Sequence, residues 1–339
     1  MIREAIARLV AGKDLSEVEA AEVTTEIMQG EATPSQVAAF LTALRLKGET
    51  ADEITGMARV MRAKALRVEV EGDVLDVVST GGGAFDPLNI STAAALVCAA
   101  AGVRVAKHGN RGFTSASGAA DVLEALGAKV DLQPDQVKVC IEETGFGFMF
   151  AQTFHPAMRF AGPTRREIGI RTIFNSLGPL TNPAGAAYQL LGAGDATLAP
   201  KIAEVVARLG TKRTLVVHSE DGLDEVSLGA PTTVRQVDGP RVKEYSLTPE
   251  EAGFGRTDLT HVRSGDAAEN AARIRAVFGG GSGPDRDYIA VNAAAALYTA
   301  GRASSFREGA ALAAEALDSG AALRLLDRYV ALSQRLGGM

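Results

Sequence analysis

The chain has 339 residues, of which 46% are apolar and 22% are charged, and it contains no tryptophan. This profile is typical of a globular protein of about two domains with a large core. A formal charge of −6 argues against broad nucleic-acid binding, and no apolar run reaches the length of a membrane span. Two cysteines and a charged N-terminus without a signal-peptide core predict a cytoplasmic protein that binds neither nucleic acid nor membranes.

Residues 1–66 predict four helices and no strand. The third helix begins with Thr33 as its cap and Gln36 three residues later, which completes a capping box, and the fourth helix repeats this device. The apolar stripes of these helices predict a small helical domain, and a surplus apolar face offers a dimer contact as the alternative to core packing. We expect a helical segment near residues 160–182 to join this domain.

From residue 73 onward the pattern alternates between strands and helices. Short β-branched runs at 74–80 and 103–109 precede helices that are predicted at 91–101 and 114–127. This order predicts an α/β domain over residues 73–339, with a mainly parallel sheet flanked by helices.

The later part of the chain adds a strand at 214–219 and a hairpin over 231–247 that turns at Gly239. The glycine-rich stretch 277–287 resembles a phosphate loop, but no predicted strand precedes it. We therefore expect a flexible connection there, followed by helices to the C-terminus.

Polar residues follow the first of these strands at the edge where open α/β sheets bind ligands. Three glycines at 81–83 allow backbone N–H groups to turn toward an anion, and the helix that follows adds its positive N-terminus. Asn89, Ser91 and Thr92 are good helix caps and offer further polar atoms. The alternative is a tight turn with ordinary caps.

The second strand is followed by two cations and several polar side chains: Lys107, His108, Asn110, Arg111, Thr114, Ser115 and Ser117. This combination suits a ligand that carries phosphate, and a solvated basic loop is the alternative.

The third strand is followed by four acids within six residues: Glu220, Asp221, Asp224 and Glu225. Beside two anion-binding loops, these carboxylates predict a bound Mg²⁺ ion, and an exposed acidic turn is the alternative. A further segment carries Arg165, Arg166 and Arg171, which either bind a substrate carboxylate or pair with surface acids.

Six segments in order resemble the anthranilate phosphoribosyltransferase family of tryptophan biosynthesis: "NISTA", "AKHGNR", "SGAADVLEALG", "FHPAMR", "RTIFNSLGPLTNPAG" and "GLDEVSL". The resemblance spans the whole chain and extends to the fold of pyrimidine nucleoside phosphorylases. It implies transfer of phosphoribose from 5-phosphoribosyl 1-diphosphate to the amine of anthranilate, with release of diphosphate. It also implies a requirement for Mg²⁺ and a homodimer formed through the N-terminal helical domain.

The resemblance assigns roles to particular residues. Catalytic roles fall on Lys107, Asn110 and Arg165. Contacts to the diphosphate donor fall on Ser79, Gly81, Gly82, Gly83, Pro87, Asn89, Ile90, Ser91, Thr92, Lys107, Gly109, Asn110, Arg111, Ser115 and Ala119. Contacts to anthranilate fall on Ser79, His108, Asn110, Arg165 and Pro179, with Arg165 facing the carboxylate. Magnesium ligation falls on Ser91, Asp224 and Glu225.

The first loop departs from the family pattern, which has glycine, aspartate and threonine where this chain has Ser79, Gly83 and Pro87. Ser79 adds a side chain near the anthranilate path, Gly83 removes a carboxylate, and Pro87 removes a hydroxyl group. Asp86 is the nearest remaining acid, but it stands at a different position. We expect catalysis to survive with an altered affinity for the magnesium–diphosphate complex.

Three other functions remain open at this point. A phosphoribosyltransferase for another aromatic amine has the same donor site, although Arg165 favours a carboxylated acceptor. A non-catalytic relative that binds nucleic acid needs a basic face, which the net charge disfavours. A nucleoside phosphorylase shares the "STGG" loop but lacks the other segments.

Overall fold

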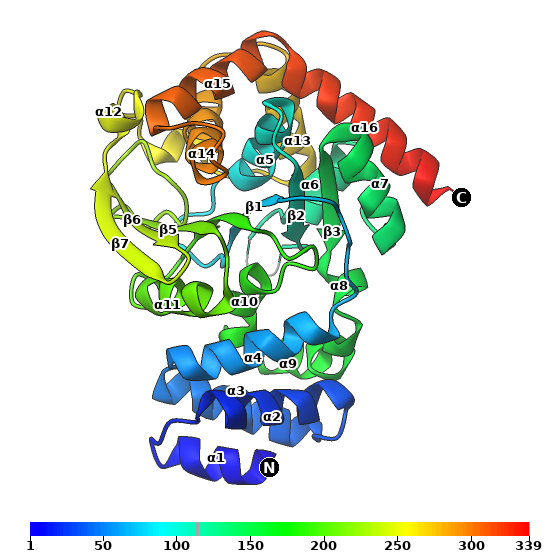
Figure 1. Cartoon of the computed structure of the whole chain (residues 1–339), viewed down its shortest axis with the longest axis vertical. Coiled ribbons are helices and arrows are strands. Elements are labelled where there is room, and N and C mark those ends of the chain that lie inside the picture. The colour runs from blue at the N-terminus through cyan, green and yellow to red at the C-terminus, as the bar shows by residue number, and fades with distance from the viewer. Residues whose placement is uncertain (113–114, 339) are drawn as a thin grey trace.

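The computed structural model describes residues 1–112 and 115–338, so Thr114 lies outside the described residues. The N-terminal part forms four helices, and Figure 1 shows them stacked at one end of the molecule. The second, third and fourth begin with capping boxes, as predicted for the last two. Their bounds are α1 (Ile2–Val10), α2 (Glu17–Gln29), α3 (Pro34–Lys47) and α4 (Ala51–Lys64).

The rest of the chain is built on a seven-stranded sheet with the order β3-β2-β1-β4-β5-β6-β7. The first five strands in this order pair in parallel, and β6 pairs antiparallel with both β5 and β7, which confirms a mainly parallel sheet. The bounds are β1 (Leu75–Ser79), β2 (Val105–Gly109), β3 (Phe146–Phe150), β4 (Tyr188–Gly192), β5 (Arg213–Ser219), β6 (Thr232–Asp238) and β7 (Arg241–Leu247).

Helices cover both faces of the sheet (Figure 1). One face packs into a core with α5 (Ile90–Ala100), α6 (Ala119–Ala125), α7 (Pro134–Thr144), α13 (Ala267–Phe278), α14 (Pro284–Thr299), α15 (Phe306–Asp318) and α16 (Ala321–Gly337). The other face packs on α11 (Ala199–Leu209), and this second core continues into the N-terminal helices. Among the described helices, none is both long and apolar enough to cross a membrane.

The bundle is fixed to the larger part of the chain by α11 and by the segment around residues 160–182. In that segment α9 (Gly162–Ile168) contacts α3, and α10 (Ile173–Leu177) contacts α4. Arg62 of α4 donates a hydrogen bond of 2.6 Å to the carbonyl of Leu180, and Lys201 of α11 donates one of 2.6 Å to the carbonyl of Glu49. The domain boundaries at residues 66 and 73 stay a prediction.

Two predicted boundaries were wrong. Helix α6 begins at Ala119, not at 114, because the Asp121 carboxylate accepts the N–H groups of both Gly112 and Gly118, and residues 115–118 are not helical. The loop predicted at 277–287 is shorter, because α13 extends to Phe278 and α14 begins at Pro284, where proline is favoured.

Candidate active site

The parallel register brings the predicted polar strand ends to one edge of the sheet. Ser79, the last residue of β1, pairs with Gly192 at the end of β4, and Gly192 pairs with Val217 of β5. Gly109, the last residue of β2, pairs with Phe150 at the end of β3. The loops that follow β1, β2 and β5 therefore meet at the same edge.

Lys107 lies at the centre of this edge with 1% of its surface exposed. Its ammonium group donates a hydrogen bond of 2.5 Å to the carbonyl of Val77 and lies 3.5 Å from the hydroxyl of Ser91. Burial lowers the pKa of Lys107, while the carboxylates of Asp76 and Glu225 oppose this effect. The lysine is thus a buried cation between two acids, aimed at the start of α5.

Asp224 and Glu225 form a buried acid pair on the other side of Ser91. One oxygen of Glu225 accepts the N–H of Ser91 at 3.2 Å, and its Oε2 has no hydrogen-bond partner among the described residues. Burial raises the pKa of both acids, and the charge of Asp224 raises that of Glu225 further. A divalent cation would reduce the repulsion between the two carboxylates and would give the open Glu225 oxygen a partner, so the pair fits Mg²⁺.

The acid cluster is smaller than its sequence suggested. Glu220 is exposed, and the Asp221 carboxylate accepts the Ser227 hydroxyl at 2.6 Å, which fixes the turn. No group of three or more histidine, cysteine or acid side chains in the described parts of the chain can hold a metal. Mg²⁺ is compatible with this result, because it takes one or two carboxylates and fills its shell with phosphate oxygens and water.

An arginine side chain supports the glycine loop (residues 81–83) through hydrogen bonds to backbone carbonyls at its start. Gly81 and Gly82 have φ values of +64° and +80°, which favour glycine. The Arg171 guanidinium donates hydrogen bonds of 2.9 Å to the carbonyls of Thr80 and Gly81. Arg171 therefore supports the loop, a use that the sequence analysis did not anticipate.

Two of the three substituted loop positions, Ser79 and Gly83, lie against Asp224, whereas Pro87 forms an isolated bridge with Arg263. The Ser79 hydroxyl donates a hydrogen bond to Asp224 and accepts the N–H of Gly81 at 2.8 Å. A Cβ at Gly83 would lie 2.8 Å from the carbonyl oxygen of Gly222 and 3.2 Å from Asp224 Oδ1. Asp86 turns away from this pair and instead accepts the N–H of Ala116 at 2.9 Å.

Helix α5 begins at Ile90, with Asn89 at the cap position but without a side-chain cap. The side-chain amide of Asn89 instead donates a hydrogen bond of 2.9 Å to the carbonyl of Ser117, and this bond connects the loops after β1 and β2. Ser91 and Thr92 lie inside the first turn, so of these three good capping residues only Asn89 occupies the cap position. The hydroxyl of Thr92 is buried without a partner among the described residues.

The loop after β2 places three of its predicted residues near the surface, while Ser117 is buried. Asn110, Arg111 and Ser115 are exposed, and Arg111 pairs with Asp121 at 3.0 Å and with Glu124 on α6. The structure therefore does not bring Arg111 beside Lys107. Gly109 packs tightly, since a Cβ there would lie 2.9 Å from Ala119 Cβ.

The candidate acceptor side is formed by α9 and the 3₁₀ turn η2 (Gly178–Leu180). Arg165 of α9 lies over the ring of Phe174 at 5.4 Å, and burial lowers its pKa to about 10. His108 Nδ1 lies 3.0 Å from the carbonyl of Gly178, which can only accept, so Nδ1 carries the proton. His108 Nε2 is then an acceptor without a partner in the described structure, and buried Pro179 follows Gly178 in the chain.

Sequence reasoning missed Asp76, Asn182 and two close-packed glycines. A Cβ at Gly192 would lie 1.7 Å from the carbonyl oxygen of Asp224, and one at Gly194 would lie 2.3 Å from that of Gly81. Asp76 interrupts the apolar run of β1, and an acid at a buried strand position was the signal that could have found it.

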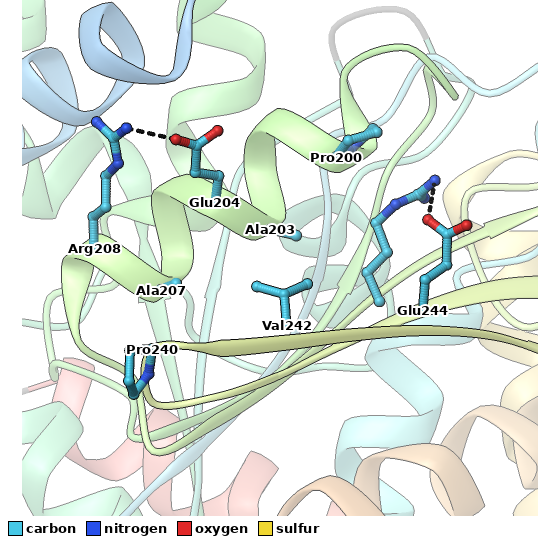
Figure 2. A pocket seen from close by; sticks show the side chains of 9 residues that line it. Pro200, Ala203, Glu204, Ala207, Arg208, Pro240, Val242 and Glu244 are labelled. Carbon is cyan, nitrogen blue, oxygen red and sulfur yellow. Dashed lines mark hydrogen bonds and ion pairs between the residues drawn. The ribbon is translucent and has the colours of Figure 1, made fainter.

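A separate groove of about 550 Å³ lies between α11 and the β6–β7 hairpin (Figure 2). Figure 2 shows the Arg208–Glu204 pair on α11 and Val242 on β7 among its lining side chains. None of the predicted site residues lines this groove, so it is not the candidate active site.

Comparison with known proteins first gives the class. The α/β domain of the glycosyl transferase family matches residues 71–323, and the helical bundle domain of the same family matches residues 3–65. The anthranilate phosphoribosyltransferase of Dehalococcoides mccartyi is 50% identical over 338 residues, 99% of each chain.

Two solved structures agree with this class. The anthranilate phosphoribosyltransferase of Thermus thermophilus superposes with a TM-score of 0.91 at 48% identity, covering 97% of this chain and 99% of its own. The enzyme of Saccharomyces cerevisiae, in complex with PRPP and Mg, superposes with a TM-score of 0.90 at 29% identity, covering 98% of both chains. The chain belongs to the glycosyl transferase family and, within it, to the anthranilate phosphoribosyltransferases.

Proposed function

We propose that this chain transfers phosphoribose from 5-phosphoribosyl 1-diphosphate to the amine of anthranilate. The observation that carries the proposal is the convergence of Lys107, Ser91 and the Asp224–Glu225 pair at one edge of the sheet. A cation and an acid pair on either side of a helix N-terminus suit a magnesium-bound polyanion. The yeast relative has been solved with PRPP and Mg, and with 4-fluoroanthranilate.

The donor is proposed to bind along the glycine loop and the first turn of α5. The Gly82 and Gly83 N–H groups and the Ser91 hydroxyl are the donors proposed for the diphosphate, because the Gly81 N–H already bonds the Ser79 hydroxyl. Thr92, whose hydroxyl is buried, is proposed as a further donor contact that needs an opening at the start of α5. The remaining donor contacts implied by the family are Ser79, Pro87, Asn89, Ile90, Gly109, Asn110, Arg111, Ser115 and Ala119. Of these, Arg111 is paired with Asp121 and would have to leave that pair to bind the donor.

Magnesium is proposed to bind Ser91, Asp224 and Glu225, where the Glu225 oxygen that has no partner among the described residues offers an open ligand position. When bound, it neutralises charge on the departing diphosphate. The Lys107 ammonium group acts on the same charge, which grows as the C1–O bond of the ribose breaks.

The acceptor is proposed to lie between Arg165, His108, Asn110 and Pro179. Arg165 remains protonated at neutral pH, since its pKa of about 10 is well above 7. It can therefore bind the carboxylate of anthranilate. An aromatic amine is already neutral at pH 7, so the site has to orient the amine more than deprotonate it, and we assign no general base. In-line attack predicts inversion at C1.

The direct test of this function mixes the purified chain with anthranilate, 5-phosphoribosyl 1-diphosphate and Mg²⁺. We expect the fluorescence of anthranilate to fall only when both the donor and the metal are present. Aniline, which lacks the carboxylate, serves as the comparison acceptor. Diphosphate release with another aromatic amine, in the absence of any reaction with anthranilate, would contradict the proposed acceptor.

The restored loop acid gives a second prediction. Gly83→Asp and Gly83→Ala place the same Cβ against Gly222, so both should destabilise the fold, by about 1–3 kcal/mol. Only the aspartate adds a charge beside Asp224. We expect Gly83→Asp alone to lower the Mg²⁺ concentration for half-maximal rate, by about threefold or more. Equal magnesium dependence in both variants would exclude a metal role at this position.

The homodimer is proposed to form through the N-terminal helices. Val10 of α1 and Leu46 of α3 leave 75% and 83% of their surfaces exposed, on two helices that contact each other. We expect Leu46→Glu to weaken self-association by about tenfold or more in sedimentation equilibrium. Val242→Glu, on the distant edge strand β7, is the matched control, and a monomeric wild-type chain would refute the proposal.

A further inference from the structure

A buried acid is the second residue of β1, and the proposed reaction does not use it. Asp76 is 0% exposed, and both of its carboxylate oxygens accept hydrogen bonds. Oδ1 accepts the backbone N–H of His108 at 3.2 Å, and Oδ2 accepts the side-chain amide of Asn182 at 2.7 Å. Its two contacts therefore lead to the end of β2 and to the turn before β4.

The pairing of β1 with β2 is interrupted at this acid. β1 pairs with β4 over five residues, and β2 pairs with β3 over five residues. Between β1 and β2, the described register contains only Leu75 with Val105. Such an opening leaves backbone groups that need other partners, since buried N–H and C=O groups are rarely unpaired.

Side chains supply those partners. Asp76 accepts from His108, Asn182 donates 2.9 Å to the carbonyl of Ala106, and Lys107 donates 2.5 Å to the carbonyl of Val77. The orientation of Asn182 is fixed, because its Oδ1 accepts the N–H of Ala184 at 2.9 Å while its amide nitrogen donates twice. The hydrogen bonds of Asp76 and Asn182, which together bridge β1 and β2, therefore have only one possible assignment of donors and acceptors.

The bridged end of β2 carries two neighbouring site residues that point to opposite sides. Lys107 reaches Ser91, on the proposed donor side, and His108 reaches Gly178, on the proposed acceptor side. A shift of this strand end would displace both groups at once. The charge of Lys107 also lies close to Asp76 and opposes the effect of burial, which raises the pKa of Asp76 to about 6.

We propose that Asp76 and Asn182 are positioning residues for the transfer reaction, which replace main-chain pairing between β1 and β2 and so fix Lys107 and His108 relative to each other. This inference rests on the proposed function. Because both side chains are buried and bonded to protein groups, their loss should affect the alignment of the two substrates more than the binding of either.

The test compares Asp76→Asn, Asn182→Ala and the double variant. In Asp76→Asn the new amide has one acceptor oxygen for two donors, so its nitrogen meets either the His108 N–H or the amide nitrogen of Asn182. The Asn182 amide cannot turn without losing its bond from Ala184. A misplacement of about 1 Å can cost 10²-fold in rate, so we expect kcat to fall by about 10–100-fold. KM for each substrate should change by less than about threefold, and the losses should be non-additive because both residues act through one bridge.

Thr214→Val is the matched control, since Thr214 is a buried β5 residue whose hydroxyl bonds only Thr211, at 3.0 Å, among the described contacts. We expect it to lower stability without changing kcat. If Asp76→Asn keeps kcat within twofold of wild type while folded, or if the two losses add, the positioning role is wrong.

Hydrogen exchange over residues 105–110 gives a readout that does not depend on activity. It should accelerate in Asn182→Ala and stay unchanged in Thr214→Val. Unchanged exchange in Asn182→Ala would overturn the inference even if the chain used a different acceptor. An inactive wild-type chain with accelerated exchange in the variant would instead count against the proposed function alone.

Discussion

Replacing Lys107 with alanine is expected to lower kcat/KM for 5-phosphoribosyl 1-diphosphate by about 10²–10³-fold, the usual cost of removing one preorganised charge-stabilising donor. The ammonium group is buried and already oriented by Val77 and Ser91, so it needs no rearrangement to meet the leaving group. KM for anthranilate should change little, because the lysine points away from the acceptor side.

The substitution also affects folding, and the kinetic prediction has to be separated from that effect. Lys107 lies near the buried carboxylates of Asp76 and Glu225, and breaking a buried ion pair costs about 3–5 kcal/mol. Lys107→Met keeps most of the apolar stem and therefore limits the loss to the charge. We expect both variants to share the kinetic defect.

Lys129→Met is the matched control, because Lys129 pairs with Asp131 at the surface and lies outside the site. It should leave kcat and both KM values unchanged. Titration calorimetry with the magnesium–donor complex gives the independent measurement. If Lys107→Met binds the donor and turns over normally, the charge of Lys107 has no role in the proposed reaction.

The sequence predicted those parts of the fold that local rules control. Capping boxes at Thr33 and Thr50 depend on residues three positions away, and both formed as expected. Strand β3 was not predicted because all five of its residues are buried, so it lacks the alternation of a half-exposed strand. The start of α6 was missed because a carboxylate nine residues away holds Gly112.

The candidate site divides in the same way. The polar residues at strand ends were readable, because parallel strands deliver them to one edge. The role of Arg171 in supporting the glycine loop could not be predicted from the sequence, since it depends on carbonyl groups about 90 residues away in the chain. The contact of Ser79 with Asp224 was hidden for the same reason, and it assigns the substituted loop residue to the acid pair.

Arg165→Ala is expected to raise KM for anthranilate by about 10–100-fold, as a charged hydrogen-bond partner is worth about 1.5–3 kcal/mol. KM for the diphosphate donor should stay unchanged, because Arg165 belongs to α9 and packs on Phe174, apart from the glycine loop. Arg166→Ala is the matched control, since this exposed neighbour lies on the same helix and should have no kinetic effect.

The acceptor itself supplies the second half of this experiment. If Arg165 binds the carboxylate, the wild-type chain should prefer anthranilate to aniline, and Arg165→Ala should lose most of that preference. Arg165→Lys should fall between the two, because lysine keeps the charge but cannot form the bidentate contact. An undiminished preference in Arg165→Ala would mean that another group recognises the carboxylate, and the acceptor site would have to be placed elsewhere along the sheet edge.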